Sequence, residues 1–249
     1  RVLTWGGGSS SSVWDAATGE RICSFRGPWP VMNFESIFPG GTRVASASLR
    51  GQGVVVWHAA TCSHLLDLES RDLVYLAPLG DGLMIALLDA NGRVTVRDST
   101  TGEAAFVLRG FHGLQEAEAA LEFGIMPQNM TFRLLAFPFS DRFAVISLEE
   151  ASIWSSTTGQ LVHKIDHGMM SGGNSLAVAS GGDVFATCSS NLASSLRLWD
   201  SRSWAPLAPA PNRTSSAADA DRCVFAIGVG AALDPQGLGD GLSWQRLLW

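Results

Sequence analysis

The sequence predicts an all-β protein in which similar four-stranded antiparallel units repeat along the chain and pack face to face around a common axis. Two regular features lead to this prediction. A tryptophan recurs at intervals of roughly 40 to 45 residues, apart from one interval of about 57 residues. A polar turn followed by a short apolar run recurs upstream of these tryptophans. The tryptophan positions are Trp14, Trp57, Arg97 (in place of a tryptophan), Trp154, Trp199 and, in a degenerate copy, Trp244.

The turn and the apolar run predict where each unit has its first strands. The four clearest copies are residues 38–48, 78–88, 138–147 and 180–190. In the second unit we expect strands near 31–38, 43–48, 54–57 and 64–68. The third strands, such as VVV at 54–56, are apolar at consecutive positions, which requires burial of both faces. A sheet that is buried on both faces needs a neighbour on each side, so the units must stack.

The segment after each tryptophan predicts a tight hairpin between the third and fourth strands. In WDAATGE, Asp15 follows the strand and Gly19 lies four residues later. The Asp carboxylate can accept a hydrogen bond from the backbone N–H two residues on, and the Gly can adopt the positive φ that closes the hairpin. The repeat positions expected to have a structural role are Trp14, Asp15, Gly19, Trp57, Asp98, Gly102, Trp154, Gly159, Trp199 and Asp200.

These motifs resemble the WD-repeat (WD40) family of β-propellers, and residues 180–203 are close to the family consensus. The resemblance covers nearly the whole chain. It implies one β-propeller domain over residues 1–249, with four-stranded antiparallel blades and a rigid platform for protein–protein contacts. The Gly-His dipeptide of the family is absent, since Gly27-Pro28 and Gly110-Phe111 stand in its place. We therefore expect apolar packing, rather than buried His–Asp pairs, to hold the blades together.

Six copies of the motif leave the choice between six and seven blades open. The chain opens at a segment that resembles a second strand, residues 1–5, and the last copy is degenerate. We favour seven blades with part outside this sequence, in a domain that belongs to a longer chain. A strand from near the C-terminus that completes the first blade is the alternative. The long interval predicts an inserted segment at about 112–130 with one short helix, either a partner contact or a tolerated insertion.

Composition restricts the classes of function. The net charge is −6, and the 17 Lys and Arg residues form no basic run, so the signature of a nucleic-acid binder is missing. No apolar stretch reaches the ~18 residues of a transmembrane helix. Charged residues make up 16% of the chain, which predicts either a surface rich in Ser, Gly and Ala or one covered by partners. The cysteines, at positions 23, 62, 188 and 223, are expected to be reduced and mostly buried in an intracellular, cytoplasmic protein.

No catalytic, metal or cofactor motif is found, so we expect no enzyme activity, no cofactor and no bound metal. His58, Cys62 and His64 invite a zinc interpretation, but a structural zinc takes four ligands and no fourth is near in sequence. Arg97 in a tryptophan position would place a charge between two units. It either extends to an edge, pairs with an unidentified carboxylate, or is simple drift of the repeat.

The predicted function is a non-catalytic protein–protein interaction scaffold within a larger multiprotein assembly. One alternative is a C-terminal sensor or adaptor propeller of a longer protein of the nucleotide-triphosphatase or ubiquitin-ligase adaptor type, and another is a propeller enzyme. Contacts are expected on the face formed by the loops between units and the loops between second and third strands, where aromatic and Arg residues contribute most binding energy. The candidates are Trp29, Arg50, Arg71, Asn91, Arg109, Phe111, His112 and Met170.

Overall fold

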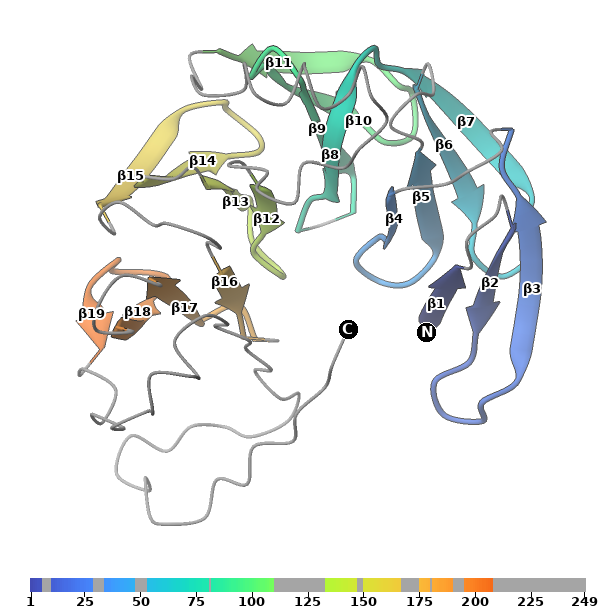
Figure 1. The fold of residues 1–249 in the computed structure, drawn as a ribbon, viewed down its shortest axis with the longest axis horizontal. Coiled ribbons are helices and arrows are strands. Elements are labelled where there is room, and N and C mark those ends of the chain that lie inside the picture. The colour runs from blue at the N-terminus through green and yellow to red at the C-terminus, as the bar shows by residue number, and fades with distance from the viewer. Residues whose placement is uncertain are drawn as a thin grey trace. The chain divides into compact units, whose positions relative to one another are not determined.

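The computed structural model describes residues 1–5, 10–28, 34–47, 53–80, 82–109, 133–146, 150–166, 175–179, 181–189 and 195–207 (Figure 1). These residues form nineteen β-strands and no helix, which confirms the all-β prediction for the described part of the chain. The chain divides into two compact units. Unit 1 is residues 1–147 and 151–164, and unit 2 is residues 148–150 and 165–249.

The strands form five antiparallel sheets, here called sheets 1 to 5 in chain order. Sheet 1 has three strands, β1 (Val2–Trp5), β2 (Ser10–Trp14) and β3 (Arg21–Arg26). Sheet 2 contains β4 (Phe34–Ile37), β5 (Arg43–Ala47), β6 (Gly53–His58) and β7 (His64–Glu69). Sheet 3 contains β8 (Leu73–Pro78), β9 (Met84–Asp89), β10 (Val94–Asp98) and β11 (Ala104–Leu108).

Sheet 4, most of which belongs to unit 1, contains β12 (Arg133–Ala136), β13 (Arg142–Ile146), β14 (Glu150–Ser155) and β15 (Leu161–Asp166). Sheet 5 of unit 2 contains β16 (Ser175–Val178), β17 (Val184–Ser189), β18 (Ser195–Asp200) and β19 (Pro206–Leu207). The four-stranded antiparallel repeat is therefore confirmed, and in sheet 2 each expected strand is present. The number of blades and the closure of a ring stay predictions. The expected insert at 112–130 and the Trp244 copy lie outside the described residues.

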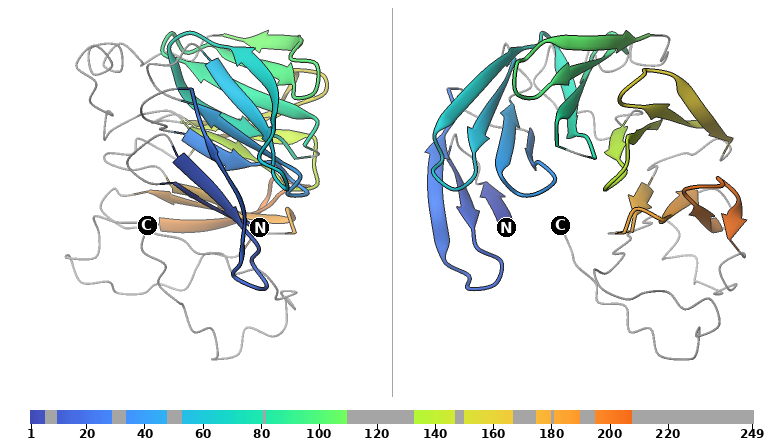
Figure 2. Two further views of the ribbon diagram at one scale, coloured as in Figure 1. Left: turned by 90° about the vertical axis from the view of Figure 1, so that its right-hand side faces the viewer. Right: turned by 180° about the vertical axis from the view of Figure 1, so that it is seen from behind.

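Within unit 1, consecutive sheets pack face to face (Figures 1 and 2). β6 shows why both faces had to be apolar. Val55 joins an apolar cluster with Val13 and Phe25 of sheet 1, whereas Val54 and Val56 join a cluster with Leu73 and other residues of sheet 3. All three valines are at most 3% exposed. The alternation of side chains along one strand thus buries both faces of sheet 2.

The first strands of consecutive sheets lie beside one another, since β4 contacts β8 and β8 contacts β12. The last strands, β3, β7 and β11, lie on the opposite side of their sheets, as sheet order requires (Figure 1). A further cluster joins Val94, Val96 and other residues of sheet 3 to Phe143 and Val145 of sheet 4. Apolar packing between neighbouring sheets therefore extends from sheet 1 through sheet 4.

In sheets 1, 2 and 5 the N–H of the repeat tryptophan donates to a side-chain hydroxyl. Trp57 is 9% exposed and stacks on Phe25 of sheet 1, with the ring centroids 4.8 Å apart. Its Nε1 donates to Ser46 Oγ at 2.7 Å. Trp199 Nε1 donates in the same way to Thr187 Oγ1 at 2.9 Å, and Trp14 Nε1 to Thr4 Oγ1 at 2.7 Å. Each hydroxyl lies on the strand next to that of its tryptophan, on β1, β5 or β17. For the buried Trp57 and Trp199, this acceptor satisfies an indole N–H that is removed from water.

The hairpin aspartates have the expected hydrogen bonds. Asp15 Oδ1 accepts from the backbone N of Ala17 at 2.8 Å and of Thr18 at 2.9 Å. Asp98 accepts from Thr100 and Thr101, and Asp200 from Arg202 and Ser203. These backbone donors stabilise the charged form, so they lower the pKa of each of the three carboxyl groups.

The residue that closes each hairpin has a positive φ in all five sheets. Gly19, Gly102 and Gly159 have φ of 73°, 80° and 67°. In sheets 2 and 5 this position is taken by Cys62 (φ 53°) and Trp204 (φ 58°), residue types that rarely adopt this conformation. The left-handed backbone is thus a property of the repeat, and glycine is its usual but not its obligatory occupant.

A disulfide joins Cys23 of β3 to Cys62 in the hairpin of sheet 2, with 5.8 Å between the Cα atoms. The expectation of reduced thiols was therefore wrong for these two cysteines. Their separation of 39 residues is close to one repeat, so stacking of consecutive sheets brings them together. The same contact recurs in the next sheets: Gly102 lies against Leu66 of β7, and Gly159 against Phe106 of β11. The hairpin of each of sheets 2, 3 and 4 therefore contacts the last strand of the preceding sheet. Between sheets 1 and 2 this contact is a disulfide bond.

Candidate binding site

Three of the predicted contact residues lie at one end of sheet 3. Arg71 precedes β8, Asn91 lies in the turn between β9 and β10, and Arg109 follows β11; all three are exposed. The pairing of Leu73 with Asp89 and of Val94 with Leu108 brings these three chain segments to the same end of the sheet. The other candidates, Trp29, Arg50, Phe111, His112 and Met170, lie outside the described residues.

A polar hollow of about 290 Å³ adjoins this end, between sheets 2 and 3. Sheet 3 contributes Leu87, Asp89, Arg93, Thr95 and Arg97 to its lining, and the segment from the end of β7 contributes Glu69, Ser70 and Arg71. Arg71 therefore belongs both to the exposed end of sheet 3 and to the wall of the hollow.

The lining includes Arg97, which takes the tryptophan position of sheet 3. Arg97 pairs with Ile85 as Trp57 pairs with Val44 and Trp199 pairs with Phe185. In sheet 2 the indole at this position is buried against the preceding sheet. Sheet 3 has Arg97 at this position instead of an indole ring, and Arg97 lines the hollow.

The second strand of sheet 3 also lacks the hydroxyl that accepts from the indole in sheets 1, 2 and 5. By strand register, Leu87 takes the position that Ser46 has in sheet 2 and Thr187 in sheet 5. Arg97 Nη1 instead donates to the carbonyl oxygen of Gly102 at 2.8 Å. Its Nε is buried and has no hydrogen-bond partner within the part of the chain that the structure describes. Arg97 thus has one donor, Nη1, that is satisfied at the hairpin, and one buried donor, Nε, that is not.

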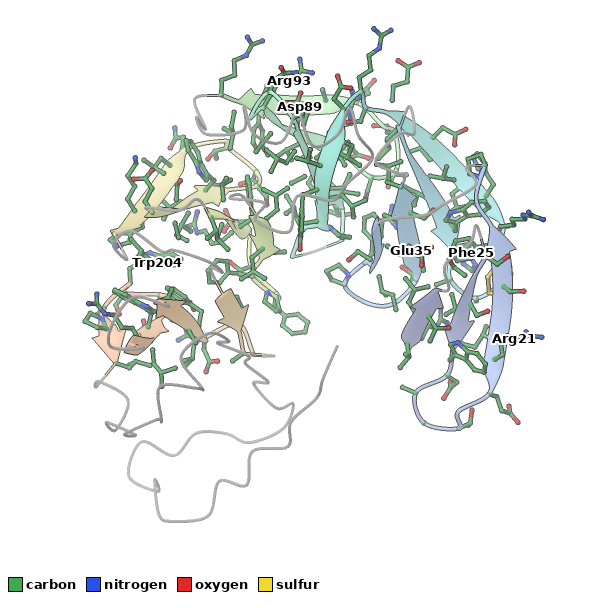
Figure 3. All side chains as sticks on the ribbon, viewed as in Figure 1. Arg21, Phe25, Glu35, Asp89, Arg93 and Trp204 are labelled. Carbon is green, nitrogen blue, oxygen red and sulfur yellow. A yellow bond between two sulfur atoms is a disulfide. The ribbon has the colours of Figure 1, made fainter. Side chains whose placement is uncertain are left out.

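Asp89 holds the turn on the other side of the hollow. Its side chain is 5% exposed, and Oδ1 accepts from the backbone N of Asn91 and of Arg93, both at 3.0 Å. Oδ2 accepts from Arg93 Nε at 2.7 Å (Figure 3). The ion pair neutralises a buried carboxylate and fixes the position of the Arg93 guanidinium, whose side chain is 47% exposed. The turn that presents Asn91 is therefore rigidly anchored.

Sequence reasoning did not identify Asp89, Arg93 or Thr95 as site residues. The sequence did contain a signal. The repeat that forms sheet 3 has Arg97 in the tryptophan position, and a second arginine, Arg93, lies four residues before it. Its meaning depends on the register of β9 and β10 and on the packing of sheet 2, neither of which a motif shows.

The zinc interpretation of His58, Cys62 and His64 does not fit the structure. The sulfur of Cys62 is bonded to Cys23 and is therefore not available as a thiolate ligand. His58 Nδ1 lies 3.1 Å from Thr61 Oγ1, and His64 Nε2 lies 2.9 Å from Asp67 Oδ1. Among the described residues, no group of three or more His, Cys, Asp or Glu side chains is placed to hold a metal ion.

A second unusual group, Glu35 of β4, lies toward sheet 1 (Figure 3). Ser11 Oγ of β2 donates to its Oε1, while its Oε2 is buried without a partner. Burial raises the pKa of Glu35 to about 7, and the hydrogen bond from Ser11 acts in the opposite direction. Glu35 does not line the hollow. We assign it to the packing between sheets 1 and 2.

The raised pKa of Glu35 predicts that the folded state loses stability as the pH rises through about 7. The folded protein binds the proton more tightly than the unfolded chain does, so the stabilisation is complete below the ordinary pKa of 4.5 and is lost above the folded value. Allowing for its partial exposure, we expect a loss of about 1 to 2 kcal/mol. Urea unfolding across this pH range should show a flatter dependence for E35Q. Equal slopes for the two proteins would contradict the assignment.

No protein-family model matches the chain, and no match was found among the curated proteins. Within the described residues, the structure holds no helix with the length and apolarity needed to cross a bilayer.

Proposed function

We propose that the protein is a non-catalytic interaction scaffold of the WD-repeat propeller type, and that it binds partner proteins at the end of sheet 3 formed by Arg71, Asn91 and Arg109. The observation that carries the proposal is the convergence of these three exposed side chains at one end of a buried sheet. Arginine is among the residue types that contribute most binding energy at interfaces, and a rigid backbone needs no ordering when a partner binds.

Two further observations support the proposal. The Asp89 hydrogen bonds hold the turn that carries Asn91, so this residue projects from a fixed backbone. The low charged fraction of 16% agrees with one of its two interpretations, a surface that is partly covered by partners. Both features favour a surface that recognises a partner without rearrangement.

Affinity purification of the tagged chain from extracts of cells that express it, with mass spectrometry, tests the proposed function. The wild type should retain a defined partner set, and the triple variant R71A/N91A/R109A should lose it at least tenfold. R21A is the matched control, since Arg21 is an exposed arginine on β3, in a different sheet (Figure 3). A partner set that is equal for all three proteins, or absent for the wild type, would overturn the proposal.

A further inference from the structure

The hollow between sheets 2 and 3 has the donors of an acceptor-binding site. Arg71, Arg93 and Arg97 all line it, and Thr95 and Ser70 add hydroxyl groups. The buried Nε of Arg97 has no hydrogen-bond partner among the described residues. A buried donor without an acceptor is unfavourable, so an acceptor ligand that reaches the Arg97 guanidinium stabilises it.

The charges in the lining select the charge of the ligand. Three arginines face two carboxylates, Asp89 and Glu69. Arg93 is already paired with Asp89, so Arg71 and Arg97 are left with the single charge of Glu69. The remaining balance of the described lining residues is one positive charge, which a monoanionic carboxylate neutralises. A phosphate dianion would bring a second negative charge into a hollow that Asp89 and Glu69 also line, and its repulsion from these carboxylates would disfavour binding.

The size and place of the hollow indicate what carries the carboxylate. Its volume of about 290 Å³ is at the lower end of the range for small-molecule pockets, which suits one side chain. Arg71 connects it to the exposed end of sheet 3, where Asn91 also lies. A peptide that crosses this end can therefore insert one side chain between sheets 2 and 3.

We propose that the hollow where Arg97 replaces the repeat tryptophan binds the carboxylate of a Glu or Asp side chain in a partner polypeptide. This proposal rests on the proposed function and names the chemistry of the partner. The guanidinium groups of Arg97 and Arg71 donate to the carboxylate, and the Asp89–Arg93 pair forms the fixed wall. The guanidinium–carboxylate hydrogen bond provides the recognition.

Nuclear magnetic resonance of the arginine Nε–H groups of the isotope-labelled chain tests the proposal directly. The probes are the capped peptide Gly-Ser-Glu-Ser-Gly and its counterparts with Gln or phosphoserine in the central position. The Glu peptide should shift the signals of Arg97 and Arg71 in a saturable manner, and the Gln peptide should bind at least tenfold more weakly. Equal shifts from the Glu and Gln peptides, no saturable shift, or tighter binding of the phosphoserine peptide would overturn the assignment.

The repeat itself provides the control variant. L87S/R97W installs the indole and the hydroxyl acceptor that sheet 2 has at Trp57 and Ser46, so it should fold with the hollow filled. The Arg71 signal of this variant should no longer respond to the Glu peptide, while R21A should bind it as the wild type does. R97M, which removes the donors without filling the space with a ring, should weaken binding at least tenfold. Unchanged binding by either Arg97 variant would contradict the proposal.

The two proposals fail in different ways. If the Glu peptide does not bind but partner capture still depends on Arg71, Asn91 and Arg109, only the assignment of the hollow is overturned. If the peptide binds and the wild type captures no partner, the scaffold function is overturned.

Discussion

Replacement of Trp57 by alanine is expected to lower the free energy of unfolding by about 3 to 5 kcal/mol, the range for large aromatic residues in a core. The indole is 9% exposed and stacks on Phe25, so its removal leaves a cavity between sheets 1 and 2. It also leaves the buried hydroxyl of Ser46 without its donor. Urea unfolding of the wild type and W57A measures the difference.

W57F separates the two contributions to this loss. Phenylalanine keeps much of the apolar contact with Phe25 but has no N–H for Ser46 Oγ, so a loss of about 1 to 2 kcal/mol is expected. S46A, which removes the acceptor and leaves the indole N–H unsatisfied, should cost a similar amount. A cost below about 1 kcal/mol for W57A would show that the tryptophan plate does not hold the sheets together.

Loss of the Cys23–Cys62 disulfide is expected to cost about 3 to 4 kcal/mol. The bond closes a loop with a sequence separation of 39 residues, and cross-links of this size restrict the unfolded chain by about that amount. It also fixes Cys62 in the positive-φ conformation that the hairpin requires. C62G, which provides the residue type found at the same position in sheets 1, 3 and 4, should recover part of the stability lost in C62S.

The comparison is made by urea unfolding with and without reductant. Reductant should destabilise the wild type by the full amount and leave C23S/C62S unchanged. An equal response of both proteins would mean that the bond contributes nothing to the folded state. Because disulfides persist mainly in oxidising environments, the same result bears on the cytoplasmic location, which stays a prediction.

The fold was predictable from sequence to the extent that each repeat carries its own local signals. The strands of sheet 2 follow from the apolar run at 54–56 and from the turns around it, and the hairpins follow from Asp15 and Gly19 and their equivalents. These features depend on neighbours within a few residues. Local chemistry therefore specifies the strands without reference to the rest of the chain.

Features that depend on stacking were not predictable in the same way. The acceptors Thr4, Ser46 and Thr187 lie ten to twelve residues before their tryptophans, on a neighbouring strand, so strand register is needed to pair them. The disulfide requires the outer strand of one sheet to touch the hairpin of the next. The sequence shows that Arg97 replaces a tryptophan. It does not show whether residues of sheet 2 fill the space that the indole would occupy.

In the candidate site too, some features follow from local sequence and others depend on contacts between strands. Arg71, Asn91 and Arg109 were predictable because the loops of a repeat protein project at the ends of its sheets. Asp89 and Arg93 were not, because their role comes from a salt bridge and two backbone hydrogen bonds within one turn. The departure from the repeat at Arg97 coincides with the hollow, where we propose that a carboxylate binds.

The central claim is that consecutive repeats stack face to face, with the outer strand of one sheet against the hairpin of the next. Peptide mapping by mass spectrometry of the chain purified without reductant, with free thiols blocked beforehand, tests it most directly. Stacking of sheets 1 and 2 predicts a linked peptide pair that contains Cys23 and Cys62. Blocked, unlinked Cys23 and Cys62, or either one bonded to Cys188 or Cys223, would contradict it.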